Sequence, residues 1–253
     1  MRDENARNRQ DQTETMPPSK RAAAGRRTKA EQRAATVEQI LDSAEDLFAR
    51  LGFFGVTISD VAEKVGVHPA LLHYYFKNKQ ELFDRVFERR VGEAVRSRTE
   101  ALDHYEAEAG DAPTVEGILK AYYVGAFDAY ITGGEDWRNF GRIFAQVNNA
   151  PGYGAEKMDF FFDPLVLRLI DLLSKALPRA TREDLFWGFH FTSGAYTLTL
   201  SRTGRIDRLS DGLCSSDDFE TIKLRFARFM AAGLRALCDS SAEDECQPPG
   251  RPG

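Results

Sequence analysis

A short segment near the N-terminus, KRAAAGRRTKAEQR at residues 20–33, concentrates positive charge. Six basic residues stand there against the single acidic residue Glu31: Lys20, Arg21, Arg26, Arg27, Lys29 and Arg33. Cations at this density can neutralise the phosphates of a nucleic acid. A solvated tail that only keeps the chain in solution has the same composition, so this segment alone leaves both interpretations open.

A second stretch, GVHPALLHYYFKNKQEL at residues 66–82, mixes hydrogen-bonding side chains with apolar ones. Its histidines, tyrosines and lysines offer donors to phosphate oxygens, and the lysines are also cations. Such a stretch is either a piece of core or a helix against which a partner lies. The choice between the two depends on the elements that flank it.

Catalytic motifs are missing from the sequence. It contains no nucleotide-binding glycine loop after a strand, no GxSxG and no HExxH. The four histidines form no cluster with Cys214, Cys238 and Cys246, and these cysteines lack zinc-type spacing. We therefore expect no enzyme, no bound metal and no cofactor. Turnover of any small molecule would contradict this expectation.

Charge is distributed unevenly along the 253 residues. Residues 1–100 carry 18 basic against 16 acidic side chains, whereas residues 101–253 carry 16 against 23. An anionic partner that meets only the front of the chain fits this asymmetry. The sequence shows no apolar signal core and no stretch long enough to span a membrane, and its odd number of cysteines suits a reducing compartment. We expect a cytoplasmic protein.

Apolar residues recur at three- and four-residue steps from Thr36 onward, which predicts an all-α chain. The first helix is expected to start at the cap Thr36 and to end at Gly52, and a long helix follows residue 78. Further helices are expected at 114–132, 135–148, 156–177, 181–202 and 217–238. Residues 1–32 are expected to be a disordered basic arm and residues 240–253 a flexible tail.

Residues 58–75 fit the spacing of a helix-turn-helix hairpin. Ala62 falls where the two helices cross most closely, so a small side chain is needed there. Gly66 falls in the turn, where a positive φ is easiest for glycine, and Pro69 opens the second helix, where its missing N–H costs nothing. The expected inner face consists of Val61, Val65, Val67, Leu72 and Tyr75. Such a hairpin is sometimes purely structural, but the basic segment before it and the lysines after it favour an anionic partner.

The stretch GFFGVTISDVAEKVGVHPALLHYYFKNKQEL carries the elements T-I-x-D-V-A, V-G-V and Y-Y-F-K-N-K-x-x-L. Over residues 36–82 it closely resembles the tetracycline-repressor (TetR) family of bacterial regulators. The resemblance implies an all-helical homodimer, with a three-helix DNA-binding head at residues 33–82 and a helical body at residues 83–239 for effector binding and dimerisation. It also implies that the second hairpin helix is a recognition helix lying in the major groove of a palindromic operator in double-stranded DNA.

The resemblance assigns contacts by position. The family's phosphate contacts fall on Thr57, His68, Leu71, His73, Tyr74 and Lys79, and its base-edge contacts on Pro69, Ala70 and Ser59. His68 is also the expected N-cap of the recognition helix. Leu71 cannot donate a hydrogen bond and can only touch a thymine methyl, and His73 stands where the family usually has tyrosine. This helix has no Arg, Asn or Gln, so we expect specificity to depend on apolar contact, DNA shape and the arm.

Two helices near the C-terminal end have the apolar spacing of a dimer interface. In the family, two such helices from each subunit form a four-helix seam, which implies a dimer interface at Phe189, Ser193, Tyr196, Phe226, Phe229 and Gly233. The same faces also suit the core of one subunit, and we expect both uses together. Thr181 with Asp184 is expected to cap the first of these helices.

The segment REDLFWGFHFTSGAYTLTLSRTGR, followed by RFARFMAAGLRAL, has a weaker resemblance to a branch of the family that responds to fatty acids or their acyl-CoA esters. The expected effector contacts are Trp137, Arg138, Phe140, Phe144, Phe161, Phe162, Trp187 and His190. Pockets for small molecules are mostly apolar with few polar groups. Each of these residues also suits a core, and Arg138 also suits a surface ion pair.

Two functions fit these patterns. The first is a dimeric transcriptional regulator, in this family most often a repressor, that is released by a small apolar effector. The effector would favour a dimer whose heads no longer match two successive major grooves. The second is a DNA-binding dimer without an effector, whose body serves only dimerisation. A body without a pocket would favour the second.

Overall fold

Every regular element of the structure, a computed structural model that describes residues 28–237 apart from the side chain of Tyr153, is a helix. The expected all-α fold is therefore confirmed. In chain order the elements are α1 (Lys29–Gly55), α2 (Ile58–Val65), α3 (Pro69–Tyr75), α4 (Lys79–Ala109), α5 (Val115–Leu119), the π-helical turn η1 (Lys120–Val124), α6 (Gly125–Thr132), α7 (Gly134–Asn148), α8 (Tyr153–Ala176), α9 (Arg182–Ser201), α10 (Arg205–Leu209) and α11 (Phe219–Leu237). Most of the expected arm, residues 1–27, and the expected tail, residues 240–253, lie outside the described residues.

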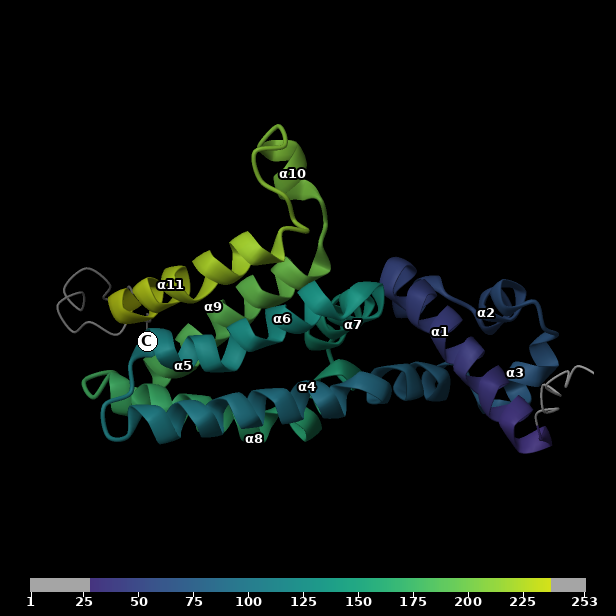
Figure 1. Ribbon diagram of the computed structural model, residues 1–253, viewed down its shortest axis with the longest axis horizontal. Coiled ribbons are helices and arrows are strands. Elements are labelled where there is room, and N and C mark those ends of the chain that lie inside the picture. The colour runs from purple at the N-terminus through teal and green to yellow at the C-terminus, as the bar shows by residue number, and fades with distance from the viewer. Residues whose placement is uncertain (1–27, 238–253) are drawn as a thin grey trace, which may run out of the picture.

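The helices form two groups joined by one long helix. Figure 1 shows α1, α2 and α3 together at one end of an elongated molecule, which we call the head, and α5 to α11 at the other, which we call the body. The 31 residues of α4 run from the head into the body. At 1.5 Å per residue this helix is about 46 Å long. It therefore connects the two groups directly.

The first helix begins earlier than expected. Thr28 is its N-cap: its side-chain oxygen accepts from the Glu31 backbone N–H at 3.2 Å, and the Glu31 carboxylate accepts from the Thr28 N–H at 2.7 Å. The expected cap at Thr36 is wrong, since its hydroxyl donates to the Gln32 carbonyl inside the helix. The reciprocal capping box explains the earlier start, because it satisfies two free N–H groups at once. Residues 29–32, expected to belong to a disordered arm, are helical.

The turns of the hairpin follow the sequence pattern. Gly52 has a φ of 74° and kinks α1 at its expected end, after which a short turn continues to Gly55. Gly66 has a φ of 78°, and its N–H donates to the carbonyls of Ala62 and Glu63. This left-handed conformation at a helix C-terminus favours glycine. Pro69 occupies the first position of α3 as expected.

The head has a continuous apolar core. Its fully buried side chains come from α1, the link to α2, α2 itself, α3 and the first part of α4: Ile40, Ala44, Phe48, Val56, Val61, Ala62, Leu72, Leu82 and Phe87. Ala62 is completely buried, in agreement with its expected place at the helix crossing. Val65 was expected to be buried but is only half-buried, because it lies in the last turn of α2 next to the exposed Gly66.

The expected helix at 114–132 is divided. Residues 115–132 are helical throughout, but the five residues of η1 have the wider π-helical bonding between α5 and α6. Two tyrosines of this turn, Tyr122 and Tyr123, are buried in the body. π-helical turns are rare and frequently occur at functional sites.

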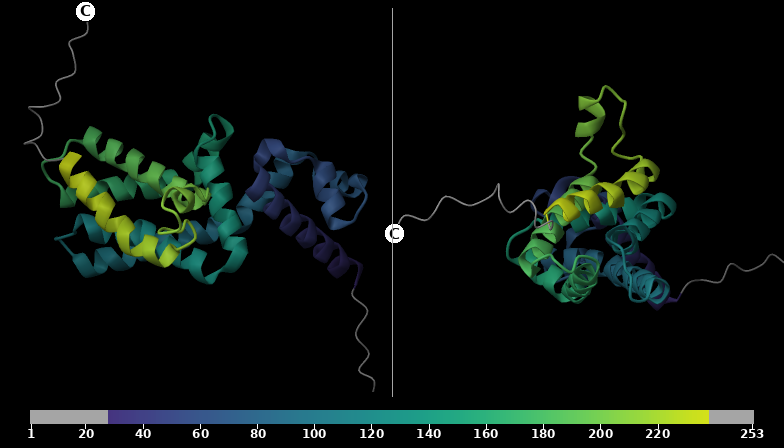
Figure 2. Two further views of the ribbon diagram at one scale, coloured as in Figure 1. Left: turned by 90° about the horizontal axis from the view of Figure 1, so that it is seen from above. Right: turned by 90° about the vertical axis from the view of Figure 1, so that its left-hand side faces the viewer.

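The body is a bundle packed through aromatic rings. Tyr196 of α9 lies against Tyr123, Phe127 and Phe144, with ring centroids 5.1 to 6.0 Å apart. The expected capping box at the start of α9 is confirmed, because Thr181 and Asp184 bond each other reciprocally. A short helix that the pattern did not predict, α10, stands out from the bundle between α9 and α11, as the right-hand view of Figure 2 shows. Among residues 28–237, no helix combines the length and apolarity needed to cross a bilayer.

Candidate nucleic-acid interface and effector site

The α2–α3 hairpin exposes the side chains that the sequence assigned to DNA. Thr57, Ser59, His68, Ala70, His73 and Tyr74 are exposed, and Pro69, Leu71 and Lys79 are half-buried. Tyr74 is 68% exposed, although an aromatic ring usually finds cover. None of these nine residues is buried in the head core, and those of α2 and α3 that are exposed face the surroundings.

His68 is fixed by its role as a cap. Its Nδ1 accepts a hydrogen bond from the Ala70 backbone N–H at 3.2 Å. An Nδ1 that accepts carries no proton, so the neutral ring has its proton on Nε2. The exposed Nε2–H is then the group left to donate to a phosphate.

Thr57 has a comparable double role at the start of α2. Its hydroxyl oxygen accepts from the Asp60 backbone N–H at 3.1 Å, and the Asp60 carboxylate accepts from the Thr57 N–H at 2.7 Å. These bonds hold the pKa of Asp60 below its usual value. The hydroxyl proton of Thr57 takes no part in this box. It remains available to a phosphate oxygen.

The ammonium group of Lys79 already has a hydrogen-bond acceptor within the head. The Nζ of Lys79 donates to the Phe53 carbonyl at 2.9 Å and lies 4.4 Å from the centre of the Phe53 ring. It therefore secures the end of α1, and this intramolecular contact competes with the expected phosphate contact.

Two other cations lie close to α3 and were not assigned a DNA contact from the sequence. The guanidinium of Arg33 stands 5.5 Å from the ring of Tyr74 and 5.4 Å from that of Tyr75. Lys77 is exposed just after α3. In the described part of the chain neither cation forms an ion pair. Their positive charge is available to an external anion.

Polar contacts join the head to the body. The carboxylate of Glu45 in α1 is buried and binds Arg90 of α4 at 3.2 Å, and Arg90 also binds Asp136 of α7 at 2.9 Å. Burial raises the pKa of Glu45, and Arg90 opposes this shift. Gln146 of α7 adds hydrogen bonds to the carbonyls of Phe48 and Ala49. The contact between head and body therefore depends on the positions of both α4 and α7.

The six side chains expected at a dimer seam divide into three groups. Phe229 and Gly233 of α11 are exposed, Phe189 and Ser193 of α9 are half-buried, and Tyr196 and Phe226 are buried within the subunit. Tyr196 and Phe226 therefore pack the core of this chain. Other large apolar side chains on α9, α10, α11 and the segment between α10 and α11 are exposed: Trp187, Phe191, Leu198, Ile206, Leu209, Leu213 and Leu224.

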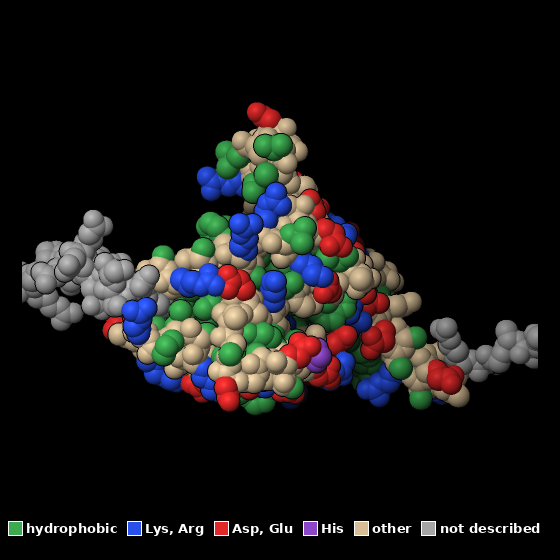
Figure 3. Space-filling model, turned by 60° about the vertical axis from the view of Figure 1, so that its left-hand side comes forward, with side chains coloured by type: hydrophobic (Ala, Val, Ile, Leu, Met, Phe, Trp, Pro, Cys, Tyr) green, Lys and Arg blue, Asp and Glu red, His purple; other side chains and the backbone are tan. Residues whose placement is uncertain are grey.

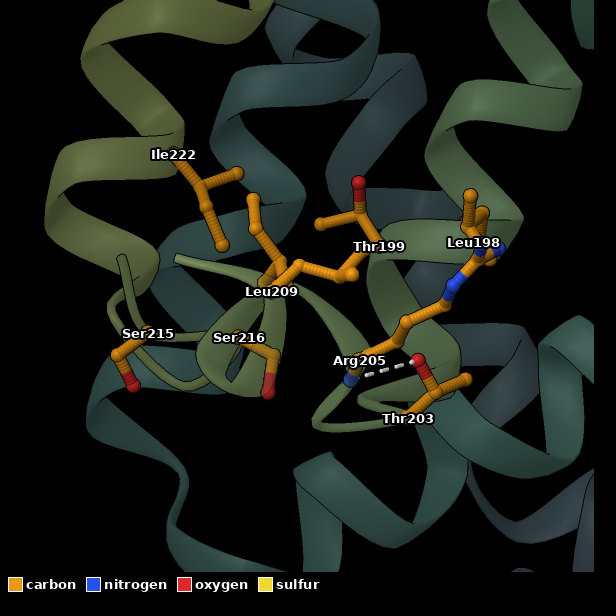
Figure 4. A pocket seen from close by; sticks show the side chains of 9 residues that line it. Leu198, Thr199, Thr203, Arg205, Leu209, Ser215, Ser216 and Ile222 are labelled. Atoms are coloured by element: carbon orange, nitrogen blue, oxygen red, sulfur yellow. Dashed lines mark hydrogen bonds between the residues drawn. The ribbon is translucent and has the colours of Figure 1, made fainter. Parts of the chain in front are cut away.

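The protruding α10 extends this apolar surface. Figure 3 shows hydrophobic side chains on the projection, exposed on the face in view. At its base is a hollow of about 460 Å³ between α9, α10 and α11. Figure 4 shows Leu209 of α10 and Ile222 of α11 pointing into it near Thr199 of α9.

The expected effector residues lie in different places. Phe140, Phe144 and Phe162 are buried, Trp137, Arg138 and Phe161 are half-buried, and Trp187 and His190 are exposed. Trp187 and His190 contact each other on the outside of α9. Arg138 pairs with Glu135 at 3.6 Å on the surface. Phe144 and Phe162 alone of this set line the interior cavity of the body, together with Arg98, a residue that the sequence reasoning missed.

Two known families match this chain. Residues 40–86 match the family described as bacterial regulatory proteins, tetR family, and residues 120–233 match the tetracyclin repressor-like C-terminal domain. The negative transcriptional regulator IcaR of the biofilm operon icaADBC in Staphylococcus epidermidis is 33% identical over 51 residues. Those residues are 20% of this chain and only 28% of IcaR. This chain therefore spans less than a third of the length of IcaR.

Two solved structures share the whole architecture. The ketosteroid transcriptional regulator KstR2 of Mycobacterium tuberculosis superposes with a TM-score of 0.55 at 15% identity, over 78% of this chain and 93% of that one. The fatty acid degradation regulator FadR of Bacillus halodurans superposes with a TM-score of 0.51 at 17% identity, over 79% of this chain and 96% of that one. At such identities the likeness shows the fold alone.

Proposed function

Because this chain belongs to the TetR family of DNA-binding transcriptional regulators, we propose that it is a cytoplasmic homodimeric repressor whose palindromic operator is released when a small apolar effector binds the body. Each subunit places α3 in a major groove. The two-fold axis of the dimer matches the symmetry of the operator.

The observation that carries the DNA proposal is the exposed face of the α2–α3 hairpin. Donors from Thr57, His68 and Tyr74 stand on it, and the cations of Arg33 and Lys77 lie beside it without ion pairs among the described residues. Phosphate contacts of this kind fix the register of a protein on DNA. Ala70 and Pro69, at the N-terminal end of α3, are then the residues nearest the base edges.

A second copy of this chain is the partner that best fits the apolar surface of α9, α10 and α11. An exposed Phe229, at 73%, is unfavourable in a monomer. A helix-turn-helix protein also needs two heads to read two half-sites about 34–36 Å apart. The projecting α10 lies on the same side as α9 and α11 (Figure 2), so it extends the proposed seam and reaches toward the partner.

The effector acts through the helices that connect its cavity to the head. Phe144 and Asn148 of α7 line the interior cavity, and Gln146 of the same helix bonds α1. Arg98 of α4 lines the cavity too, and α4 continues to the head. A ligand that moves α7 or α4 therefore changes the angle of the head. The shift requires that the ligand binds the two arrangements with different affinity.

The alternative, a DNA-binding dimer without an effector, is favoured by one observation. The interior cavity has a volume of only about 20 Å³, far below the roughly 300 Å³ of a typical ligand pocket. A ligand must therefore displace side chains to enter. The composition of the cavity wall, rather than its volume, supports the effector reading.

A footprint of the purified protein on DNA flanking its own coding sequence tests the proposal. We expect a protected palindrome at low and moderate salt, which disappears when an apolar carboxylic acid or its acyl-CoA ester is added. Protection that persists with every such compound would support the alternative. The absence of protection at both salt concentrations would contradict repression of its own promoter.

A further inference from the structure

Arg98 of α4 is a charged residue enclosed in the apolar body. It is 5% exposed and lies on the buried stripe of α4 between Ala94 and Leu102. Arginine retains its positive charge in proteins, and an isolated buried charge is strongly unfavourable without a partner. The position therefore requires an explanation.

The groups around this guanidinium are neutral. It donates to the Tyr196 hydroxyl at 2.8 Å and to the Ala94 carbonyl at 2.9 Å. The rings of Phe144, Phe162 and Tyr196 lie 5.7 to 6.0 Å from its central carbon. Within residues 28–237 no carboxylate forms an ion pair with it. Its charge is solvated by dipoles and rings alone.

A second polar group beside Arg98 lacks a partner. The hydroxyl of Tyr123 is buried, and no atom of the described residues forms a hydrogen bond with it. Burial raises the pKa of Tyr123 well above the ordinary tyrosine value and that of Tyr122 to about 12. Both phenols are therefore protonated at neutral pH and cannot neutralise Arg98. The Tyr123 hydroxyl is therefore a buried donor without an acceptor among the described residues.

Both tyrosines belong to the π-helical turn η1. Two successive tyrosines of this turn, Tyr122 and Tyr123, line the cavity, and their ring centres are 4.7 Å apart. π-helical turns are rare and frequently occur at functional sites. The irregular turn is a second sign, independent of the charge, that this wall is specialised.

The cavity between these groups has a polar floor and a rim that is apolar except for Asn148 and Ser193, which bond each other at 3.4 Å. Arg98, Tyr122, Tyr123 and Tyr196 contribute polar groups to the floor, which is completed by Phe144 and Phe162. Half-buried side chains from α7, α8 and α9 form the rim: Asn148, Met158, Val166, Phe189 and Ser193. The 20 Å³ between them accommodates about one water molecule. A larger ligand enters by moving the rim, where Met158 is the most adaptable side chain.

We propose that Arg98 and Tyr123 form the receptor for the carboxylate of an apolar monocarboxylic acid, whose hydrocarbon tail leaves the floor through the rim between α7, α8 and α9. The proposal rests on the effector-released repressor described above and names the chemical class of its effector. The carboxylate accepts hydrogen bonds from the Arg98 guanidinium and from the Tyr123 hydroxyl. One ligand group thus neutralises the buried charge and gives the Tyr123 hydroxyl an acceptor.

A free carboxylate fits this floor better than the related acyl-CoA ester or a phosphate. One guanidinium balances one negative charge, whereas a phosphate monoester brings nearly two. A thioester carbonyl is neutral and would leave Arg98 unpaired. The proposed site therefore favours the free acid over its acyl-CoA ester, two effector classes that the sequence analysis did not distinguish.

Calorimetric titration of the full-length protein tests the assignment. Decanoate is the probe, with 1-decanol as the uncharged control, decanoyl-CoA as the ester and sodium chloride as the small anion. We expect decanoate alone to bind. Tyr123→Phe should weaken its binding about tenfold and Arg98→Met about a hundredfold, because hydrogen bonds to charged groups contribute about 1.5–3 kcal/mol. Tyr105→Phe, whose hydroxyl bonds Thr114 outside the cavity, is the matched control and should not change the affinity.

The variants should remain folded, because each removes a group without an ideal partner. We expect the Tm of unliganded Tyr123→Phe and Arg98→Met to equal or exceed that of the wild type. Equal decanoate affinity in wild type and Arg98→Met would overturn the proposal. So would binding of chloride alone, or of decanoyl-CoA with the same dependence on Arg98.

The footprint separates this site from the proposed function. If decanoate binds through Arg98 but the operator stays protected, the site is supported. The proposal that its ligand releases the operator is then wrong. If the wild-type protein protects its operator but does not bind decanoate, the proposed site is wrong and the DNA-binding proposal stands.

Discussion

The side-chain amide of Gln146 donates to the backbone carbonyl of Phe48 at 3.1 Å, across the boundary between body and head. The same nitrogen lies 3.3 Å from the Ala49 carbonyl, in the last turn of α1 before the kink at Gly52. The Oε1 atom of Gln146 is buried and has no partner among the described residues. Because Phe144 and Asn148 of the same helix line the interior cavity, α7 joins that cavity to α1.

Replacing Gln146 by leucine should weaken the communication between effector and operator. Gln146→Leu removes both bonds to α1, which should lower the free energy of unfolding by about 1–3 kcal/mol. We expect decanoate to bind the variant normally but to reduce its operator affinity much less than in the wild type. Fluorescence anisotropy with labelled operator measures the operator affinity with and without decanoate, and the ratio of the two affinities is compared between variant and wild type.

Asn149→Leu is the matched control for that experiment. The Asn149 amide donates to the Ala145 carbonyl at 2.7 Å, so its bond stays within α7 and does not reach the head. Its operator affinity should respond to decanoate as the wild type does. An undiminished response in Gln146→Leu would contradict transmission through this contact.

Salt dependence should identify the cations that bind phosphate. Arg33→Ala and Lys77→Ala each remove two cations from a dimer, so each should lower the slope of log K against log salt by about 1.8. Affinity should fall similarly for every DNA sequence, because phosphate contacts position rather than specify. Lys64→Ala is the control, since Lys64 already pairs with Asp46 and its slope should be unchanged. Equal slopes in the wild type and all three variants would show that Arg33 and Lys77 do not contact DNA phosphates.

Base preference should change at the N-terminal end of α3. Ala70 is exposed there, and Ala70→Asn introduces a side chain that can bond adenine in bidentate fashion. We expect an altered preference of about fivefold or more at one position of each half-site, with the salt slope unchanged. Binding to a library of single-base operator variants measures it. Glu63→Asn, exposed on α2 outside the expected contacts, should leave the preference intact.

Dimerisation should depend on the exposed face of α11. A double substitution, Leu224→Asp with Phe229→Asp, places charges where a second copy is proposed to pack, on side chains 77% and 73% exposed in the subunit. We expect monomers in analytical ultracentrifugation with an unchanged helical circular dichroism spectrum, and a loss of operator binding. Phe160→Asp on α8 is an equally exposed control and should remain dimeric. Dimers of both variants would place the seam elsewhere.

The sequence predicted the hairpin well because its turns depend on local chemistry. Gly66 must adopt a positive φ and Pro69 suits a first helical position, so their spacing fixes the frame without tertiary information. The capping box of Thr181 and Asp184 was predictable for the same reason. The start of α1 was missed although Thr28 and Glu31 form the same local pattern, because apolar periodicity begins only later.

The residues of the interior cavity depend on tertiary packing and were mostly missed. Arg98 belongs to a strongly charged stretch, so its charge suggested an exposed position. Its spacing from the buried Ala94 and Leu102, four residues on either side, is the signal that could have identified it. The π-helical turn that presents Tyr123 has no comparable sequence pattern. The bond from Gln146 to α1 spans 98 positions, which no local pattern reports.

Selection of operators from a random pool of double-stranded DNA tests the central claim, that two α3 helices of one dimer read DNA. The account predicts an enriched palindrome whose half-sites lie one helical turn apart, about 10 base pairs between centres, and whose preferred base changes with Ala70→Asn. No enriched sequence, or an enriched sequence that Ala70→Asn leaves unaltered, would contradict it.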